Sequence, residues 1–253
     1  YLEKISNSRI NRDFLFGYSP ERINPGDRKN NFENIDKIIS GSNNLSLALM
    51  KKIYSSVIKK VHVSTDITTA EMAKVIENVQ RDINIAFVNE VSLISNKFKI
   101  NSNEVLKLSN TKWNFLNFKP GLVGGHCIGV DPYYLAHVAS KVGYHADVIL
   151  SGRRVNDGMG KFVAEKAVKL LIKNDLPIKG ARIHILGLTF KEDCPDLRNS
   201  KVVDTIYELR DYGVEVSCSD PIADPSDFRN EYGIEIVRSE TVCDSDLVII
   251  AVA

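Results

Sequence analysis

One stretch of the chain combines a lone cysteine with residue types that could make it reactive. It runs Phe118-Lys-Pro-Gly-Leu-Val-Gly-Gly-His-Cys-Ile-Gly-Val-Asp-Pro-Tyr-Tyr-Leu135, with four glycines within nine residues. Glycine adopts backbone conformations that other residues avoid and lets a ligand approach the main chain. Pro132 marks a helix start at its first position, so Cys127 would lie near a helix N-terminus, where the dipole lowers a thiol pKa. The pattern predicts a glycine loop that presents Cys127 as a nucleophile, with Asp131 beside it.

Two other interpretations of this cysteine stay open from the residues alone. A lone cysteine often serves as a small buried hydrophobe rather than as a nucleophile. The neighbouring His126 could act as a general base in a cysteine hydrolase, although adjacent loop residues usually point apart.

Composition narrows the class of protein. The chain has 253 residues, of which 43% are hydrophobic and 26% charged, as in a globular protein of one large or two smaller domains. A formal net charge of +1 argues against nucleic acid or an anionic membrane as partner. Four widely spaced cysteines, without a CxxC pair, argue against a metal site or a disulfide framework and favour a cytoplasmic location.

Both ends of the chain suggest a piece of a longer protein. The sequence opens on Tyr1 rather than on methionine, and it closes on an apolar run over 246–253. A buried parallel strand normally leads into a loop and a helix.

Short apolar runs and helical repeats alternate in the first 66 residues, which predicts α/β structure. A loop with two prolines and a glycine follows the first strand. The expected strands cover 13–18, 37–40 and 61–64, and the expected helix covers 45–60.

The longest predicted helix covers about 68–97, with Thr68 or Thr69 as its cap and Glu71 in its first turn. At about 45 Å it exceeds what a small domain needs, which favours a domain connector or a dimer spine. A row of polar residues shares one face, and the favoured interpretation is a solvated surface. The row is Lys74, Asn78, Asp82 and Asn89.

Further helices are predicted over 101–108, 133–142 and 158–174, with Asn101 or Ser102 capping the first and Gly143 ending the second. The last 73 residues predict a parallel sheet, in which Ser200 caps a helix that ends at Gly213. No G-x-G-x-x-G dinucleotide fingerprint occurs in the sequence. The expected strands of this sheet are 181–186, 214–218, 234–237 and 247–252.

Several motifs in order resemble the UDP-glucose/GDP-mannose dehydrogenase family. Together they cover nearly the whole chain, which is far more specific than any single motif. Within the family, the likeness is strongest to UDP-N-acetylglucosamine 6-dehydrogenases of bacterial surface-polysaccharide synthesis. The motifs lie in Gly17–Asp27, Ala70–Asn78, Thr111–Phe115, Gly121–Leu135 and Leu186–Arg198.

The resemblance implies an NAD-binding Rossmann-type domain, a helical central domain that forms a homodimer, and a C-terminal Rossmann-like domain with a parallel sheet. Residues 1–66 would be the remainder of the first domain, 67–157 the central domain, and 158–253 a truncated UDP-sugar-binding domain. The missing glycine fingerprint would then lie outside this sequence, and we expect no turnover from the isolated chain.

The resemblance also implies a reaction, in which a sugar C6 alcohol is oxidised twice to a carboxylate with two NAD. Cys127 would trap the aldehyde as a thiohemiacetal, which the second oxidation converts to a thioester. Lys74 would stabilise the developing alkoxide, and Asn78 would share that oxygen or hold a water. Asp131 would order or activate water. Glu21 matches a glutamate tied to thioester hydrolysis, or is a solvent-exposed loop acid.

Ligand contacts carry over from the same motifs. Arg198 matches an arginine that reaches NAD, although Lys191 and Arg198 could instead form an exposed basic loop beside Asp193 and Asp196. No metal is implied. The implied substrate-binding residues are Arg22, Asn24, Phe118, Lys119, Gly121, Gly124, Phe190 and Lys191.

Departures from the family pattern bear on the substrate. Pro25 and Val130 stand where relatives that act on UDP-glucose have a glutamate and a lysine. The arginine that the partner subunit gives to the substrate in those relatives has no clear counterpart near Thr111 and Lys112. These differences favour a UDP-N-acetylhexosamine, and the run Asp131–Tyr134 favours the gluco form over the manno form. UDP-ManNAc, UDP-glucose and a non-catalytic sugar-nucleotide-binding dimer scaffold are the alternatives.

Overall fold

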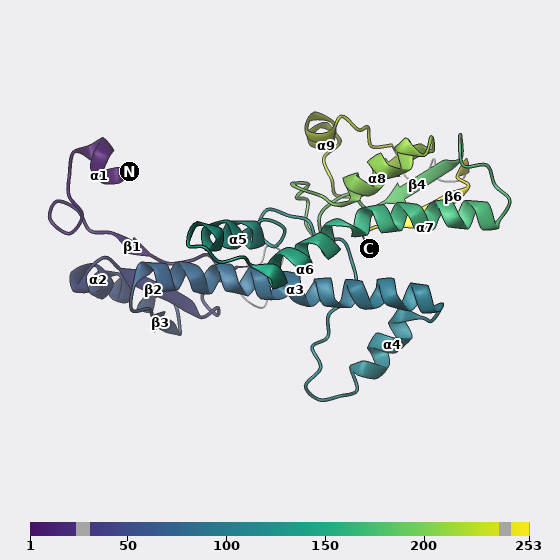
Figure 1. Ribbon diagram of the computed structural model, residues 1–253. Helices are drawn as coiled ribbons and strands as arrows, with labels where there is room; N and C mark the ends of the chain where they lie inside the picture. Colours follow the sequence, from purple (N-terminus) through teal and green to yellow (C-terminus); the bar gives the residue numbers. More distant parts are fainter. Residues whose placement is uncertain (24–30, 238–243, 253) are drawn as a thin grey trace. The chain divides into compact units, whose positions relative to one another are not determined.

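The computed structural model describes residues 1–23, 31–237 and 244–252 (Figure 1). The chain divides into two compact units, Tyr1–Glu77 and Asn78–Ala253. The division into three domains at 66 and 157 stays a prediction, because compactness separates two units rather than three. Each unit is described on its own.

The first unit contains a small mixed sheet. β1 (Gly17–Tyr18) pairs antiparallel with β2 (Lys37–Gly41), and β2 pairs parallel with β3 (Val61–Val63). The strand predicted over 13–18 is shorter in the structure, since Phe14 makes only an isolated bridge to Ile10. A short helix, α1 (Leu2–Ser6), was not predicted.

The helix after β2 begins one residue before its predicted start. α2 covers Asn44–Ser55, and Asn43 caps it in a reciprocal capping box with Ser46. This arrangement satisfies two backbone amides that a helix N-terminus otherwise leaves without partners. The predicted extension to residue 60 is wrong, because the chain leaves the helix at Ser56 and reaches β3.

The long helix has nearly its predicted length. α3 covers Ile67–Phe98 and continues from the first unit into the second. The expected cap is wrong: Asp66, rather than a threonine, accepts a hydrogen bond of 2.8 Å from the backbone amide of Thr69. Glu71 lies beyond the first turn, which contains no acidic residue.

The helical part of the second unit agrees largely with the sequence. α4 (Ser102–Ser109) is capped by Asn101, α5 covers Asp131–Lys141, and α7 covers Met159–Lys173. α5 begins one residue earlier than Pro132, so the proline occupies its second position. α6 (Asp147–Asp157) was not predicted.

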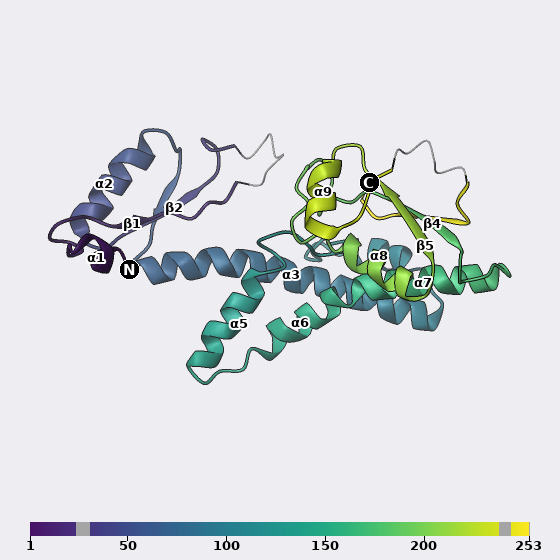
Figure 2. The same cartoon turned by 90° about the horizontal axis from the view of Figure 1, so that it is seen from above.

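The rest of the second unit is a parallel sheet with strand order β5-β4-β6, and Figure 2 labels β4 and β5 of it. The strands are β4 (Arg182–Leu186), β5 (Glu215–Ser219) and β6 (Leu247–Ile250), and the helices α8 (Val202–Asp211) and α9 (Pro225–Tyr232) alternate with them. Burial of apolar surface stabilises this α/β layer. Its most buried side chains include Leu171, Ile183, Ile185, Ile206, Leu209 and Phe228.

Two predictions about this layer are wrong. Residues 234–237 form no strand, although the Val237 amide donates one hydrogen bond of 2.8 Å to Cys218. Ser200 does not cap α8, because its hydroxyl donates to the Leu188 carbonyl at 2.6 Å and Lys201 takes the cap position. The predicted end of α8 is confirmed, since Gly213 follows with a φ of 78°.

Two features of the described residues bear on membranes and metals. None of the helices described is long and apolar enough to cross a membrane. Within the same residues, no cluster of three or more His, Cys, Asp or Glu side chains is arranged to hold a metal ion. Among the described residues, Cys127, Cys194 and Cys218 are not joined in disulfides, and Cys243 lies outside these residues.

A buried histidine makes the stability of this unit depend on pH. His184 on β4 is fully buried, with Nδ1 2.7 Å from the Ser217 hydroxyl and Nε2 2.8 Å from that of Ser219. Burial lowers the pKa of its imidazole, so the folded state binds a proton less readily than the unfolded chain. Its contribution is therefore fully present above the unfolded pKa of about 6.5 and is lost as pH falls below it.

We expect the free energy of unfolding to decrease below pH 6.5 by up to about 1.4 kcal/mol per pH unit from this group. Urea unfolding at pH 7.5 and 5.5 measures the decrease. His184→Gln keeps polar contacts with both serines and should show a smaller decrease over that range. An equal decrease in the variant and the wild type would contradict the assignment.

Candidate active site

The glycine loop ends in a turn that places Cys127 four positions before Asp131, the first residue of α5 (Asp131–Lys141). The Cys127 carbonyl accepts hydrogen bonds from the amides of Val130 and Asp131, at 3.0 and 2.8 Å. The residue is half-buried, which distinguishes it from the fully buried Cys218, whose pKa burial raises to about 11. The expectation that Cys127 lies near a helix N-terminus is thus met by the backbone.

Two of the predicted catalytic residues meet at this helix start. The Asn78 amide on α3 donates a hydrogen bond of 2.5 Å to the Asp131 carboxylate. Asp131 is the first residue of α5 and lies four positions after Cys127. The carboxylate is therefore oriented by a neighbouring helix instead of turning freely in solvent.

The polar row on α3 is not a solvated face, contrary to the favoured expectation. Asn89 is fully buried, and its amide group exchanges two hydrogen bonds with the Gly121 backbone, at 2.8 and 3.0 Å. It also donates to Asn156 of α6 at 2.8 Å. One amide side chain thereby fixes the start of the glycine loop to α3 and α6.

A buried ion-pair network surrounds Arg153 of α6, which is only 1% exposed. Its guanidinium bonds to Asp82 of α3 at 2.7 Å and also to Asp157, while Asn156 donates to Asp82 at 2.7 Å. Burial raises the pKa of Asp82. Burial lowers the pKa of Arg153, but the two carboxylates beside it raise that pKa above its usual value. Tyr133 of α5 donates to Asp157 at 2.5 Å, so the network joins α3, α5 and α6.

A second loop, residues 187–201, lies directly against the glycine loop. The Gly125 amide donates to the Asn199 carbonyl at 3.2 Å, and the Asn199 side chain donates to the Gly125 carbonyl at 3.1 Å. A Cβ at Gly124 would lie 2.4 Å from the same Asn199 carbonyl oxygen. Gly125 has a φ of +84° and faces the ring of Phe190. Both glycines are therefore required by backbone conformation and close approach.

The two loops, together with Ala251 and Val252 after β6, line an open cavity of about 290 Å³. Four of the predicted substrate-binding residues line it: Gly121, Gly124, Phe190 and Lys191. Phe118 and Lys119 precede the loop and are not among its lining residues. The lining residues that the sequence did not indicate include Thr189, Glu192, Ser200, Lys201 and Val202.

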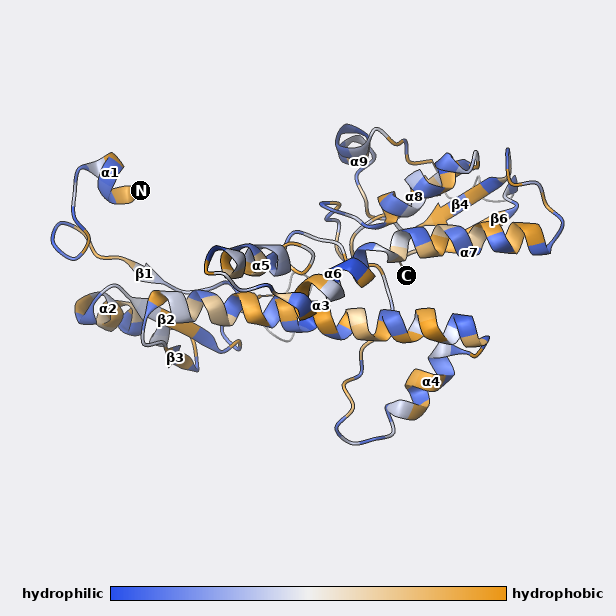
Figure 3. Ribbon diagram, viewed as in Figure 1, coloured by the Kyte–Doolittle hydropathy of each residue, from blue (hydrophilic) through white to orange (hydrophobic). Residues whose placement is uncertain are grey.

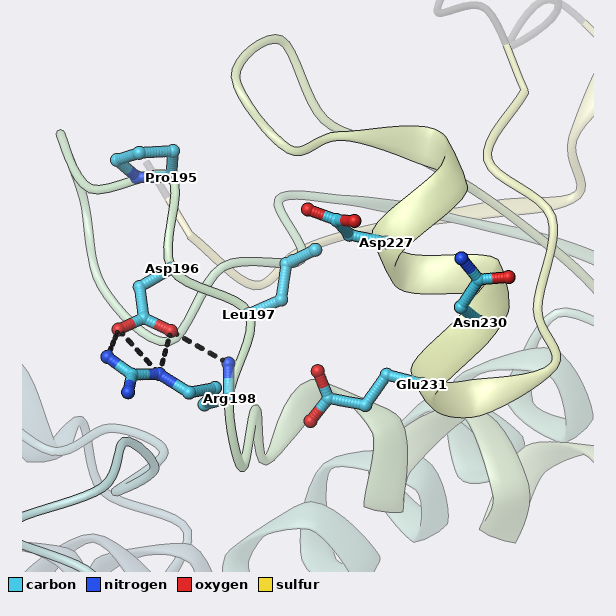
Figure 4. A pocket seen from close by; sticks show the side chains of 7 residues that line it. All are labelled: Pro195, Asp196, Leu197, Arg198, Asp227, Asn230 and Glu231. Atoms are coloured by element: carbon cyan, nitrogen blue, oxygen red, sulfur yellow. Dashed lines mark hydrogen bonds and ion pairs between the residues drawn. The ribbon is translucent and has the colours of Figure 1, made fainter.

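Arg198, the predicted cofactor contact, lies beside the glycine loop and is exposed. Its guanidinium makes a two-armed ion pair with Asp196, with distances of 3.0 and 2.6 Å (Figure 4). Hydrogen bonding to Arg198 lowers the pKa of the Asp196 carboxyl. The Asp196 carboxylate also lies 3.6 Å from Nδ1 of His126. Asp196 and Arg198 line a second cavity, of about 520 Å³, together with Asp227 and Glu231 of α9.

The remaining predicted residues belong to the first unit. Glu21 accepts hydrogen bonds of 2.7 Å from the amides of Arg22 and Ile23, and it pairs with the buried Lys37 at 3.5 Å. Burial alone would raise the pKa of Glu21, but these donors lower it. Arg22 forms an ion pair of 2.8 Å with Glu77.

Three assignments remain predictions for this reason. Lys74 is half-buried and lies on the part of α3 that belongs to the first unit. Glu21 and Arg22 also belong to the first unit. Their roles beside Cys127 are therefore untested. Asn24 and Pro25 lie outside the described residues.

Comparison with known proteins decides the family. Residues 68–158 match the central domain of the UDP-glucose/GDP-mannose dehydrogenase family, and residues 184–253 match the UDP binding domain of the same family. The chain belongs to the UDP-glucose/GDP-mannose dehydrogenase family. The resemblance inferred from the motifs is thus confirmed, as is the α/β fold with a helical central part.

Individual relatives support the same conclusion. Protein CapL of Staphylococcus aureus is 52% identical over 99% of this chain and 59% of its own length. UDP-N-acetyl-D-glucosamine 6-dehydrogenase of Pseudomonas aeruginosa is 51% identical over 100% of this chain and 60% of its own. The structure of a UDP-D-ManNAc dehydrogenase from Pyrococcus horikoshii superimposes with a TM-score of 0.87 at 32% identity, covering 99% of this chain and 58% of that one. The chain therefore spans about three fifths of these relatives.

Several positioning residues escaped the sequence analysis. Asn199 directly follows Arg198, and Lys201 lies three positions after it, so the end of the recognised motif was a usable signal. Arg153 and Asp157 are four residues apart, which is the spacing of an ion pair on a helix, but α6 itself was not predicted.

The two glycines of the cavity provide a matched test. Gly124→Ala places a methyl group against the Asn199 carbonyl, whereas a Cβ at Gly121 meets no atom within 4 Å. We expect Gly124→Ala to lower the free energy of unfolding by about 1–3 kcal/mol. Gly121→Ala should change it by less than about 0.5 kcal/mol. Urea unfolding measures both, and equal effects would contradict the close approach of the two loops.

Proposed function

We propose that this chain is the central and UDP-binding part of an NAD-dependent UDP-sugar 6-dehydrogenase. The observation that carries the proposal is the hydrogen bond from Asn78 to Asp131 at the start of α5, whose backbone is bonded to that of Cys127. The loop that carries Cys127 also lines the cavity of the second unit, through Gly121 and Gly124. Family membership and the names of the relatives support it.

NAD is the proposed hydride acceptor, although the described residues do not by themselves fit a whole dinucleotide. Such a cofactor is normally held at a glycine-rich turn between a strand and a helix, and the sequence lacks the fingerprint. In the first unit, β2 and β3 are the parallel pair among the described strands. Arg198 is the residue of this chain assigned to the cofactor, and the roles below concern the protein's own groups.

Cys127 is the proposed nucleophile. After the first two-electron oxidation of the C6 alcohol, the thiolate sulfur adds to the aldehyde carbon, and the carbonyl oxygen gains a proton to give a thiohemiacetal. The second two-electron oxidation leaves a thioester. Water then attacks the thioester carbon, so that the C–S bond breaks. This step releases the carboxylate product and regenerates the Cys127 thiol.

The other roles follow from charge and hydrogen bonding. Asp131, held by Asn78, orders or deprotonates the attacking water, since an oriented carboxylate is a suitable acceptor. Lys74 is proposed to stabilise the negative charge that develops on the substrate alkoxide oxygen, because an ammonium group favours such a charge. It gives Glu21 a part in thioester hydrolysis.

A UDP-N-acetylhexosamine is the proposed substrate, with UDP-GlcNAc preferred to UDP-ManNAc and UDP-glucose. The relative from Pseudomonas aeruginosa named for UDP-N-acetyl-D-glucosamine is 51% identical, whereas the Pyrococcus horikoshii enzyme named for UDP-D-ManNAc is 32% identical. The product would enter surface-polysaccharide synthesis. Cysteines that form no disulfide among the described residues fit a reducing cytoplasm.

A homodimer through α3 is part of the proposal. Large apolar side chains of α3 in the second unit are exposed, among them Phe87 at 56% and Phe98 at 72%. Figure 3 shows hydrophobic bands recurring along this helix. Exposed apolar surface of this kind is typical of a protein–protein interface.

Calorimetry with UDP-GlcNAc tests the binding part. We expect the chain to bind it more tightly than UDP-glucose, and Lys191→Ala to weaken binding about tenfold, because a lysine in the cavity can pair with a phosphate. Lys173→Ala, at the exposed end of α7, is the matched control and should change nothing. Absence of binding to every UDP-sugar would contradict the assignment.

The nucleophile is tested within a full-length enzyme that supplies the NAD-binding domain. Cys127→Ser should reduce carboxylate formation roughly a thousandfold or more, because serine forms no thioester. Cys194→Ser, at a buried thiol, is the control and should retain activity. Normal carboxylate yield from Cys127→Ser would refute the mechanism, and tight binding without turnover by the wild type would favour the scaffold alternative.

A further inference from the structure

Charged residues that have no role in the chemical steps of the proposed reaction lie on the loop next to Cys127. The loop 187–201 is joined to the glycine loop by the paired hydrogen bonds of Gly125 and Asn199. Arg198 directly precedes Asn199, so its backbone is fixed beside the cysteine loop. Asp196, two residues earlier, contacts both Arg198 and His126, the immediate neighbour of Cys127.

Electrostatics agrees with this geometry. The pKa of the Arg198 guanidinium is raised first by its hydrogen bond to Asp196, and the charge of Cys127 raises it further. The geometry is given by the paired hydrogen bonds of Gly125 and Asn199 and by the contact of Asp196 with His126, which place the residues flanking Arg198 against those next to Cys127. By reciprocity, a guanidinium that gains from a thiolate also favours the thiolate over the thiol.

We propose that Arg198 stabilises the thiolate form of Cys127 and that Asp196 limits this effect by pairing with the same guanidinium. Arg198 is thus a positioning residue for the nucleophile, in addition to any contact with a cofactor. The inference deepens the proposed function at the same site. It can nevertheless be tested without substrate, cofactor or turnover.

Other ionisable groups around Cys127 also enter its pH dependence. His126 lies on its own loop, and Asp131 begins α5; from α3, the neutral Asn78 faces Asp131. The second loop adds Lys191, and Glu231 of α9 lies beyond Arg198. Because these groups stay in place in an Arg198 variant, a difference between two profiles isolates the guanidinium.

The rate of Cys127 alkylation by iodoacetamide, followed by mass spectrometry from pH 6 to 10, measures the thiol pKa of the chain as it is. We expect Arg198→Gln to raise this apparent pKa by about half a unit and to slow alkylation about threefold at pH values below it. Arg198→Lys keeps the positive charge and should restore most of the rate. Salt at about 0.5 M should move the wild type toward the glutamine variant, because exposed charges are screened.

Asp196→Asn tests the second half of the proposal. It removes the negative charge but keeps an acceptor for the guanidinium, so the apparent pKa of Cys127 should fall rather than rise. Loosening of the loops alone would move both variants in one direction, whereas the proposal requires opposite directions. An unchanged profile in Arg198→Gln, or equal shifts of the same sign, would overturn it.

Two controls separate charge from unfolding. Arg229→Gln removes a similarly exposed arginine on α9 that pairs with Glu235, and it should leave the profile unchanged. Cys218 is buried and should stay unlabelled in every folded variant. If UDP-sugars fail to bind while the Arg198 shift is found, the proposed substrate is wrong and the electrostatic inference stands.

Discussion

The buried guanidinium of Arg153 is the constraint on which the second unit depends. A charge withdrawn from water is stable only beside opposite charges, and the loss of one partner leaves it uncompensated. Asp82 and Asp157 supply the compensation from two different helices, so α6 has one favourable register against α3. Because Tyr133 donates to Asp157, α5 shares this register. The helix that begins at Asp131 is thus positioned by polar contacts as well as by apolar packing.

Hydrogen bonds to the main chain fix the glycine loop to α3 and to the second loop. Asn89 holds both backbone groups of Gly121, and Asn199 does the same for Gly125, so the glycine loop is fixed at two points. The Asn89 side chain suits this task because an amide offers both a donor and an acceptor, whereas Asn199 donates from its side chain and accepts at its backbone carbonyl. The glycines of this loop are held in place because neighbouring side chains bond to their backbone. Cys127 follows these glycines in the chain, so it extends from an ordered loop.

Much of this could be predicted from the sequence, and the exceptions have physical causes. The glycine motif and the apolar repeat of α3 are local signals, and both identified their elements. The burial of Asp82 and Asn89 is different, since spacing shows which residues share a face but not what packs against it. Ser200 was expected to cap α8, but its hydroxyl reaches the carbonyl of Leu188, which is distant in sequence. Such competition between local and tertiary hydrogen bonds is decided only by the fold.

The close approach of Gly124 to the Asn199 carbonyl also restricts how the sequence can change over evolution. An insertion beside either residue would displace a donor and an acceptor that lie on separate loops. Compensation would require a matching change in the other loop, which single substitutions rarely provide. Length variation among descendants of this chain is therefore confined to segments away from this contact, such as the exposed turn at Gly143 and Tyr144.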